Sequence, residues 1–131
     1  MDNLNIPVKD LTGADPRTLA EEIIHILDVH KGSDLKLLHV TEKTILADYF
    51  VLCTGNSTTQ VRGLSGEIEY RMGLDGLVPL RIEGEDSATW IIQDYASVLV
   101  HIFNRESRSF YNLDRLWADA EEVDISALLI E

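Results

Sequence analysis

The segment whose residue types best match a reactive site runs from Thr54 to Gln60 and reads Thr-Gly-Asn-Ser-Thr-Thr-Gln. An apolar run precedes it and an amphipathic stretch follows, and a strand, a glycine turn and a helix N-terminus are the parts of which phosphate sites are built. A Walker-type loop also needs a lysine after its last glycine, and this segment has none. The alternative is that Asn56 or Ser57 simply caps the helix that follows.

A nucleotidyltransferase-like site at the same turn would need acidic residues on a neighbouring strand. Metal-dependent transfer requires two carboxylates close together to hold the ions. No Asp-x-Asp or Glu-x-Asp pair follows on an expected strand, and Glu67 and Glu69 lie within an expected helix. We therefore expect no enzyme activity, cofactor or metal, and a nucleotide-binding protein or enzyme that uses Gly55 to Thr59 is the alternative.

Two other sets of side chains have the types needed for nucleophilic catalysis. Cys53 with His101 would make a nucleophile and a base, and Ser57 with His101 and Asp94 would make a triad. A lone cysteine in an apolar strand is more often buried and unreactive. Neither set is favoured, and we expect no catalytic residues.

The remaining composition limits the class of protein. The single cysteine excludes a disulfide framework and a Cys-rich zinc site, and His25, His30 and His39 lack zinc-type spacing. The N-terminal residues lack the basic and apolar regions of a signal peptide, and no apolar run approaches the roughly 20 residues of a membrane helix. These features predict a cytoplasmic protein that does not bind membranes.

The charge of the chain bears on its partners. Its 131 residues are 45% hydrophobic and carry 23 acidic against 11 basic side chains, for a net charge of −12. This length suits one domain with a real core. The negative charge would repel a phosphate backbone, so direct, extensive nucleic-acid binding is not expected, whereas a basic protein would be attracted. The acidic excess also has a simpler explanation, which is solubility.

Two helices are predicted from apolar spacing. Asp15 can cap a helix that begins at Pro16 and continues until Gly32. A second helix is expected from about Ser57 to Met72. Gly63 and Gly66 interrupt it at a cost of about 1 kcal/mol each relative to alanine, so we expect close packing on a sheet there.

About five strands are expected around these helices, and they include residues 35–38, 49–54 and 78–82. Residues 90–94 and 98–103 should form a hairpin. If the loop between these strands has an even number of residues, Trp90 lies opposite His101, Ile92 opposite Leu99 and Gln93 opposite Val98. An odd number of loop residues would change which side chains of the two strands share a face of the hairpin. The predicted fold is α/β (α+β), with one mixed sheet and the two main helices on one face.

The faces of the hairpin differ in character. An even loop places Ile91, Val98, Val100 and Ile102 on one aliphatic face, which suits the two helices. The other face then carries Trp90, Ile92, Leu99, His101 and Phe103. Aromatic side chains with polar edges are preferred anchors of protein interfaces, although each could equally fill a core. We expect a partner-binding surface formed by Trp90, Tyr95, His101, Phe103, Arg105 and Tyr111, with Trp117 close by in a short helix or turn over residues 109–117.

Four blocks of sequence resemble, in order and spacing, the Iojap family of ribosomal silencing factors. They are residues 47–57 (Ala-Asp-Tyr-Phe-Val-Leu-Cys-Thr-Gly-Asn-Ser), 83–90 (Glu-Gly-Glu-Asp-Ser-Ala-Thr-Trp), 94–103 and 110–117 (Phe-Tyr-Asn-Leu-Asp-Arg-Leu-Trp). The resemblance covers about Leu19 to Trp117. The turn after Asp94-Tyr95 departs from the family, in which Gly-Asp is usual where this chain has Ala96-Ser97.

The resemblance implies a mixed sheet related to the nucleotidyltransferase fold without its catalytic acids. It implies a protein that binds the large ribosomal subunit through large-subunit ribosomal protein fourteen, blocks joining of the small subunit, and so reduces translation in starvation. It also implies ribosome contact by Trp90, and a homodimer when the protein is free. The expected organisation is a flexible arm at residues 1–14, an Iojap-like domain at 15–118 and an acidic tail at 119–131.

Overall fold

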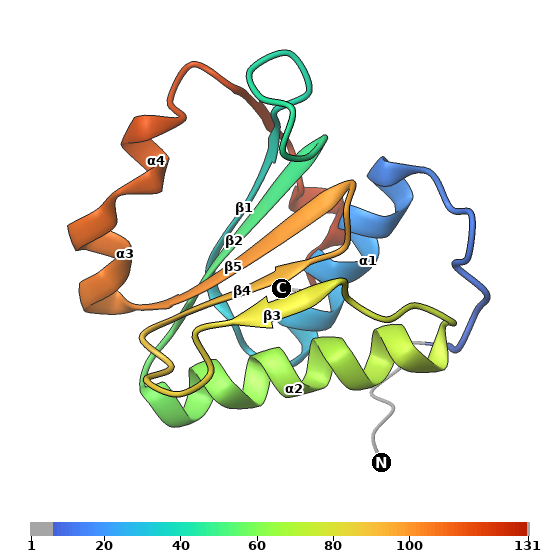
Figure 1. Ribbon diagram of the computed structural model, residues 1–131, viewed down its shortest axis with the longest axis horizontal. Coiled ribbons are helices and arrows are strands. Elements are labelled where there is room, and N and C mark those ends of the chain that lie inside the picture. Colours follow the sequence, from blue (N-terminus) through green and yellow to red (C-terminus); the bar gives the residue numbers. More distant parts are fainter. Residues whose placement is uncertain (1–6, 131) are drawn as a thin grey trace.

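The computed structural model describes residues 7–130, which build a six-stranded mixed sheet with helices on both faces (Figure 1). The strands lie in the order β3-β4-β5-β2-β1-β6. The central pair, β2 and β5, is parallel, and every other neighbouring pair is antiparallel. The strand bounds are β1 Ser33–His39, β2 Tyr49–Gly55, β3 Arg81–Glu83, β4 Trp90–Asp94, β5 Val98–Asn104 and β6 Glu121–Val123.

The two long helices begin where the sequence predicts. α1 spans Pro16–Val29, and the carboxylate of Asp15 accepts a hydrogen bond from Thr18 N at 2.8 Å. α2 spans Thr58–Leu74, and Ser57 Oγ accepts one from Gln60 N at 3.1 Å. Each cap satisfies one of the N–H groups that a helix start leaves without an intrahelical partner.

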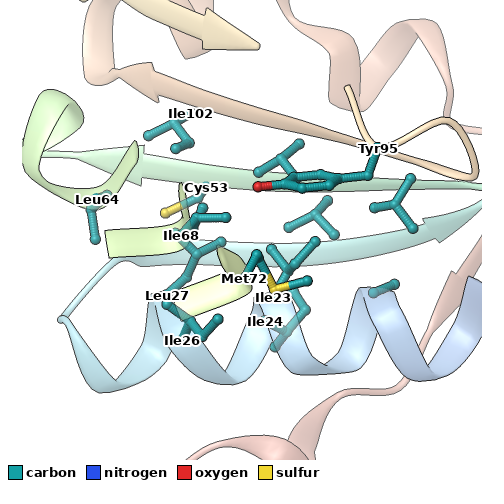
Figure 2. Packing of buried hydrophobic residues seen from close by; sticks show 14 of the residues in the cluster. Ile23, Ile24, Ile26, Leu27, Cys53, Leu64, Ile68, Met72, Tyr95 and Ile102 are labelled. Carbon is teal, nitrogen blue, oxygen red and sulfur yellow. The ribbon is translucent and has the colours of Figure 1, made fainter. Parts of the chain in front are cut away.

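Both long helices pack on one face of the sheet, as predicted. Ile23, Ile26 and Leu27 of α1 and Leu64 and Ile68 of α2 are buried there at intervals of three and four residues. Against them lie β2 and β5 side chains that point to the same face, including Val51, Cys53, Val100 and Ile102. Figure 2 shows side chains of the helices and the strands packed together in this core.

The hairpin of β4 and β5 has the predicted faces but not the predicted register. Trp90 lies opposite Phe103 rather than His101, and Ile92 lies opposite His101 rather than Leu99. The loop contains only Ala96 and Ser97, because Tyr95 N donates to Val98 O at 2.9 Å. Two-residue loops are the commonest hairpin connections. The shift of two residues preserves the side-chain alternation, so each side chain stays on its expected face.

Both ends of the described chain pack more closely than expected. Residues from the expected acidic tail form β6, in which Val123 pairs with Leu37 of β1. The sheet therefore has six strands rather than about five, and it extends past residue 118. Near the other end, Leu11 is buried and its N–H donates to Asp75 O at 2.8 Å, so the part of the expected arm that is described is fixed to the end of α2. The first six residues of that arm lie outside the described residues.

The second face of the sheet is covered by α3 (Arg105–Tyr111) and α4 (Leu113–Leu116), on the opposite side from α1 and α2 (Figure 1). Asn112, in the left-handed region at φ 51°, separates the two helices and caps α4. A smaller apolar cluster lies beneath them and includes Phe50, Leu52, Phe103 and Leu113. The face of the sheet that carries Trp90, His101 and Phe103 is therefore a second, smaller core, and only part of it is exposed to solvent.

The glycines inside α2 do not face the sheet. Gly63 and Gly66 are exposed, and a Cβ atom at either position would meet no other atom within 4 Å. The prediction of close packing at these residues is therefore wrong. The periodicity of the helix already places Val61, Leu64 and Ile68 on the buried side, which turns both glycines toward solvent.

Candidate partner-binding site

The turn that follows Gly55, the last residue of β2, leads directly into the first turn of α2. The Ser57 hydroxyl caps α2, and the Asn56 side-chain oxygen accepts a hydrogen bond from Arg105 Nη2 at 3.0 Å. Gly55 is required by packing, since a Cβ atom there would lie 2.9 Å from Val61 Cγ2. The interpretation of Ser57 as a helix cap is confirmed.

The two sets of residues considered for nucleophilic catalysis are not assembled. Cys53 pairs with Ile102 and points to the face of α1 and α2, whereas His101 points to the opposite face. Burial also raises the pKa of the Cys53 thiol to about 12, so the thiolate is not formed at neutral pH. Asp94 ends β4 at the hairpin loop, while Ser57 follows the opposite end of the neighbouring strands, so these two cannot share a triad.

Trp90 is the centre of an aromatic cluster on the second face of the sheet. Its ring stacks on Phe103 with centroids 5.0 Å apart and lies 4.7 Å from the ring of Tyr111 on α3. Phe103 is fully buried, Trp90 is half-buried and Tyr111 is exposed. The three rings therefore form a continuous path from the core to the surface.

His101 supports Trp90 from below. Trp90 Nε1 donates a hydrogen bond to His101 Nδ1 at 3.2 Å, so the proton of the neutral imidazole is on Nε2. His101 is 5% exposed, and burial, with a smaller effect from the charge of Arg108, lowers its pKa to about 4. Nε2 has no hydrogen-bond partner among the described residues. The ring is therefore neutral at physiological pH.

An apolar groove, which we call the aromatic groove, opens beside Trp90 between the hairpin and α4. Its volume is about 290 Å³, and its apolar lining includes Leu46, Phe50, Trp90, Leu99, Leu116 and Trp117. Leu46 and Leu116 are exposed at its edges. Arg81, Glu83 and Asp94 supply charged groups to the lining. An apolar centre with aromatic anchors and a polar rim is the usual anatomy of a protein interface.

The structure brings together four of the six predicted site residues, Trp90, His101, Phe103 and Tyr111. Trp90 and Tyr111 lie at the surface of the aromatic cluster, while His101 and Phe103 lie beneath it. Arg105, at the start of α3, is exposed but does not line the groove. Hydrophobic groove residues that we had not predicted include Leu46, Phe50, Leu113 and Leu116. Leu46 lies in the loop between β1 and β2, where no periodic pattern of apolar residues marks a side chain as exposed or buried.

Tyr95 is placed on the opposite side of the sheet from the aromatic groove. It is buried in the core beneath α1 and α2, as Figure 2 shows, and its hydroxyl donates to Gln93 Oε1 at 2.8 Å. Gln93 Nε2 in turn donates to Ser65 Oγ at 2.7 Å and to Ser65 O at 2.8 Å. The prediction that Tyr95 belongs to the partner-binding surface conflicts with this placement. The face of the two helices was expected to be purely aliphatic and instead contains this polar chain.

The fold and the aromatic groove define a small α/β protein with a surface suited to a protein partner. Within residues 7–130, no set of three or more His, Cys, Asp and Glu side chains is placed to hold a metal ion. The same residues contain no helix of the length and apolarity required to span a membrane.

Known proteins that are similar to this chain include ribosomal silencing factors. The family described as "Ribosomal silencing factor during starvation" matches residues 13–131. Ribosomal silencing factor RsfS of Bacillus subtilis is 37% identical over 98 residues, which is 75% of this chain and 83% of that protein. RsfS of Halalkalibacterium halodurans is 31% identical over 85% of this chain and 95% of that protein. The chain belongs to the ribosomal silencing factor family.

Solved structures agree with this assignment. A crystal structure of a protein from Chromobacterium violaceum superposes with a TM-score of 0.77 at 26% identity, over 79% of this chain and 87% of that chain. A second, from Bacillus halodurans, has a TM-score of 0.68 at 30% identity, over 82% of this chain and 95% of that chain. More distant relatives include a chloroplastic Iojap protein of Zea mays, so the resemblance to the Iojap family is confirmed.

Proposed function

We propose that this protein represses translation by occupying the large ribosomal subunit through the aromatic groove and blocking the small subunit from joining. Membership of a family named for ribosomal silencing supplies the role. The observation that supports this surface is the half-buried Trp90, whose ring stacks on buried Phe103 and lies beside exposed Tyr111 at the edge of an apolar groove. Such anchored aromatic side chains carry a large share of the binding energy at protein interfaces.

The proposed mechanism is steric, so the protein acts as a binding factor and not as an enzyme. A bound domain of this size covers part of the subunit surface, and a second subunit cannot occupy the same space. The lack of an assembled nucleophile and base at Cys53, Ser57 and His101 supports a mechanism without chemistry.

The proposed partner on the subunit is a basic ribosomal protein, which we assign as large-subunit ribosomal protein fourteen. The net charge of −12 favours approach to a basic protein surface and opposes wide contact with ribosomal RNA. In the free protein the same apolar groove could be covered by a second copy, which gives a homodimer in the cytoplasm. Dimerisation and ribosome binding would then compete for Trp90.

Co-sedimentation tests this proposal. The purified protein is mixed with isolated large or small ribosomal subunits and sedimented through sucrose, and subunit joining is measured at raised magnesium. We expect binding to the large subunit only, and fewer joined ribosomes. Trp90→Ala should weaken binding by about 2 kcal/mol, or more than tenfold, because it removes the anchor of the groove.

Tyr70→Ala is the matched control. Tyr70 is 56% exposed on α2, which covers the opposite face of the sheet, so its loss should leave large-subunit binding unchanged. If a folded Trp90→Ala variant bound the large subunit as tightly as the unmodified protein, the aromatic groove would not be part of the interface. Failure of the unmodified protein to bind the large subunit would reject the proposed function itself.

A further inference from the structure

A second hollow, separate from the aromatic groove, lies between the first residues of β1 and the helices α3 and α4. Its volume is about 500 Å³, which is within the usual range of small-molecule sites. Three basic side chains line it, Lys36, Arg105 and Arg108, together with Asp34, Asp114 and Thr54. None of these residues lines the aromatic groove. We call this hollow the cationic cleft.

Arg108 is held in a fixed position within the cationic cleft. Its Nε and Nη2 atoms donate to the two carboxylate oxygens of Asp114 at 2.8 and 3.0 Å, and its Nη1 atom donates to Thr54 Oγ1 at 2.9 Å. These bonds use three of the five N–H groups of the guanidinium, and no further partner is described for the other two in residues 7–130. A guanidinium held in this way loses little freedom on binding an anion.

Lys36 and Arg105 bring two further positive charges to the same hollow. Lys36 Nζ lies 2.8 Å from Asp114 Oδ2. Arg105 is 62% exposed and has a long pair with Asp34, at 3.9 Å, besides its hydrogen bond to Asn56. Arg108 and Lys36 hold the pKa of Asp114 well below its ordinary value, so Asp114 is ionised. Three positive groups therefore face two carboxylates in a chain whose net charge is −12.

The backbone around the cationic cleft is specialised. Asp34 and Asn112, both lining residues, have left-handed φ angles of 50° and 51°, and the register of β1 is irregular between Ser33 and Lys36. Such backbone features concentrate at binding sites. The cleft also lies at the carboxyl ends of the parallel strands β2 and β5, since Thr54 lines it and Arg105 follows β5 directly. Ligands of α/β sheets bind at this edge.

We propose that the cationic cleft binds the phosphate group of a small phosphorylated molecule, with Arg105, Arg108 and Lys36 as its ligands. Arginine pairs with phosphate oxygens through two N–H groups at once, and the Thr54 and Ser109 hydroxyls, which also line the cleft, can add hydrogen bonds. A small ligand is favoured over RNA because the positive side chains are confined to one hollow. An extended polyanion would also meet the remaining negative surface of the protein.

Titration calorimetry with inorganic pyrophosphate and with ADP, on the isolated full chain at low ionic strength, tests this proposal without ribosomes. We expect saturable binding of at least one of these probes, with one site per chain. Arg105→Gln should weaken it about tenfold, since a charge-assisted bond is lost. Asp34→Asn should strengthen it severalfold, because it removes the carboxylate beside Arg105. Both residues are exposed, so neither variant should disturb the fold.

Arg17→Gln is the charge-matched control, because Arg17 is exposed on α1 and pairs there with Glu21. It should leave the affinity unchanged. Equal weakening by Arg17→Gln and Arg105→Gln would overturn the proposal, since it would show general charge attraction. No saturable heat with either probe, or binding of an RNA oligonucleotide alone, would overturn it as well. Amide chemical shifts that change at Thr54, Ser109 and Asn112 on pyrophosphate addition would support it, whereas changes confined to the aromatic groove would contradict it.

Discussion

Trp90 and His101 are joined by a hydrogen bond of 3.2 Å from the indole Nε1 to the imidazole Nδ1, although they are not opposite each other in the hairpin. The bond runs diagonally, because Trp90 faces Phe103 and His101 faces Ile92. A buried neutral histidine thus positions Trp90, the half-buried ring at the centre of the aromatic cluster. The proposed anchor of the partner interface is consequently linked to a titratable group.

The pH dependence of stability should reflect His101. Its pKa is about 4 in the folded protein and 6.5 ordinarily, so the unfolded chain takes up the proton first as the pH falls. The contribution of neutral His101 is complete above about pH 6.5 and is lost as the pH falls toward 4. His101→Phe should therefore lose less free energy of unfolding between pH 7 and pH 5 than the unmodified protein, as measured by urea denaturation. Equal losses would contradict this.

Tyr95→Phe should separate stability from partner binding. The variant removes one buried hydrogen bond to Gln93 and should lower the free energy of unfolding by about 1 kcal/mol. Because Tyr95 lies in the core on the far side of the sheet, co-sedimentation with the large ribosomal subunit should be unchanged. A specific loss of ribosome binding in a stable Tyr95→Phe protein would return Tyr95 to the interface.

Asp114→Asn should loosen α3 and α4 from the sheet. Asp114 accepts two hydrogen bonds from Arg108 and pairs with Lys36, and its loss leaves the half-buried guanidinium without a counter-ion. We expect a loss of about 2 kcal/mol in the free energy of unfolding at pH 7. The lowered pKa of Asp114 means that this stabilisation is present above about pH 4 and is lost on further acidification. Urea denaturation of both proteins at pH 7 and pH 3 checks this, and a constant difference would count against the ion pair.

Replacement of Gly55 and of Gly66 by alanine should change the stability of the fold in opposite directions. At Gly55 the added Cβ atom would lie 2.9 Å from Val61 Cγ2 and 3.2 Å from Val61 N, so Gly55→Ala should destabilise the fold by about 1–3 kcal/mol. At Gly66 no atom lies within 4 Å, and alanine favours helix, so Gly66→Ala should stabilise by about 0.5–1 kcal/mol. Thermal unfolding of the two variants decides the point. A destabilised Gly66→Ala protein would indicate packing at that glycine after all.

Features that depend on residues close together in the chain could be predicted from the sequence. The caps at Asp15 and Ser57, the two long helices and the alternation of faces in the hairpin follow from local hydrogen bonding and from periods of 3.6 and 2 residues. The four family blocks were also present in the sequence, and they led to the correct family.

Features that depend on contacts between distant residues could not be predicted in this way. Residues of the expected tail form β6, which pairs with β1 at the edge of the sheet. Phe103 and His101 are buried on the face that α3 and α4 cover, whereas Trp90 is half-buried. The cationic cleft joins Lys36, Thr54 and Arg108, which are far apart along the chain. Register, burial and clefts are set by how whole elements pack, because one local pattern is compatible with several long-range arrangements.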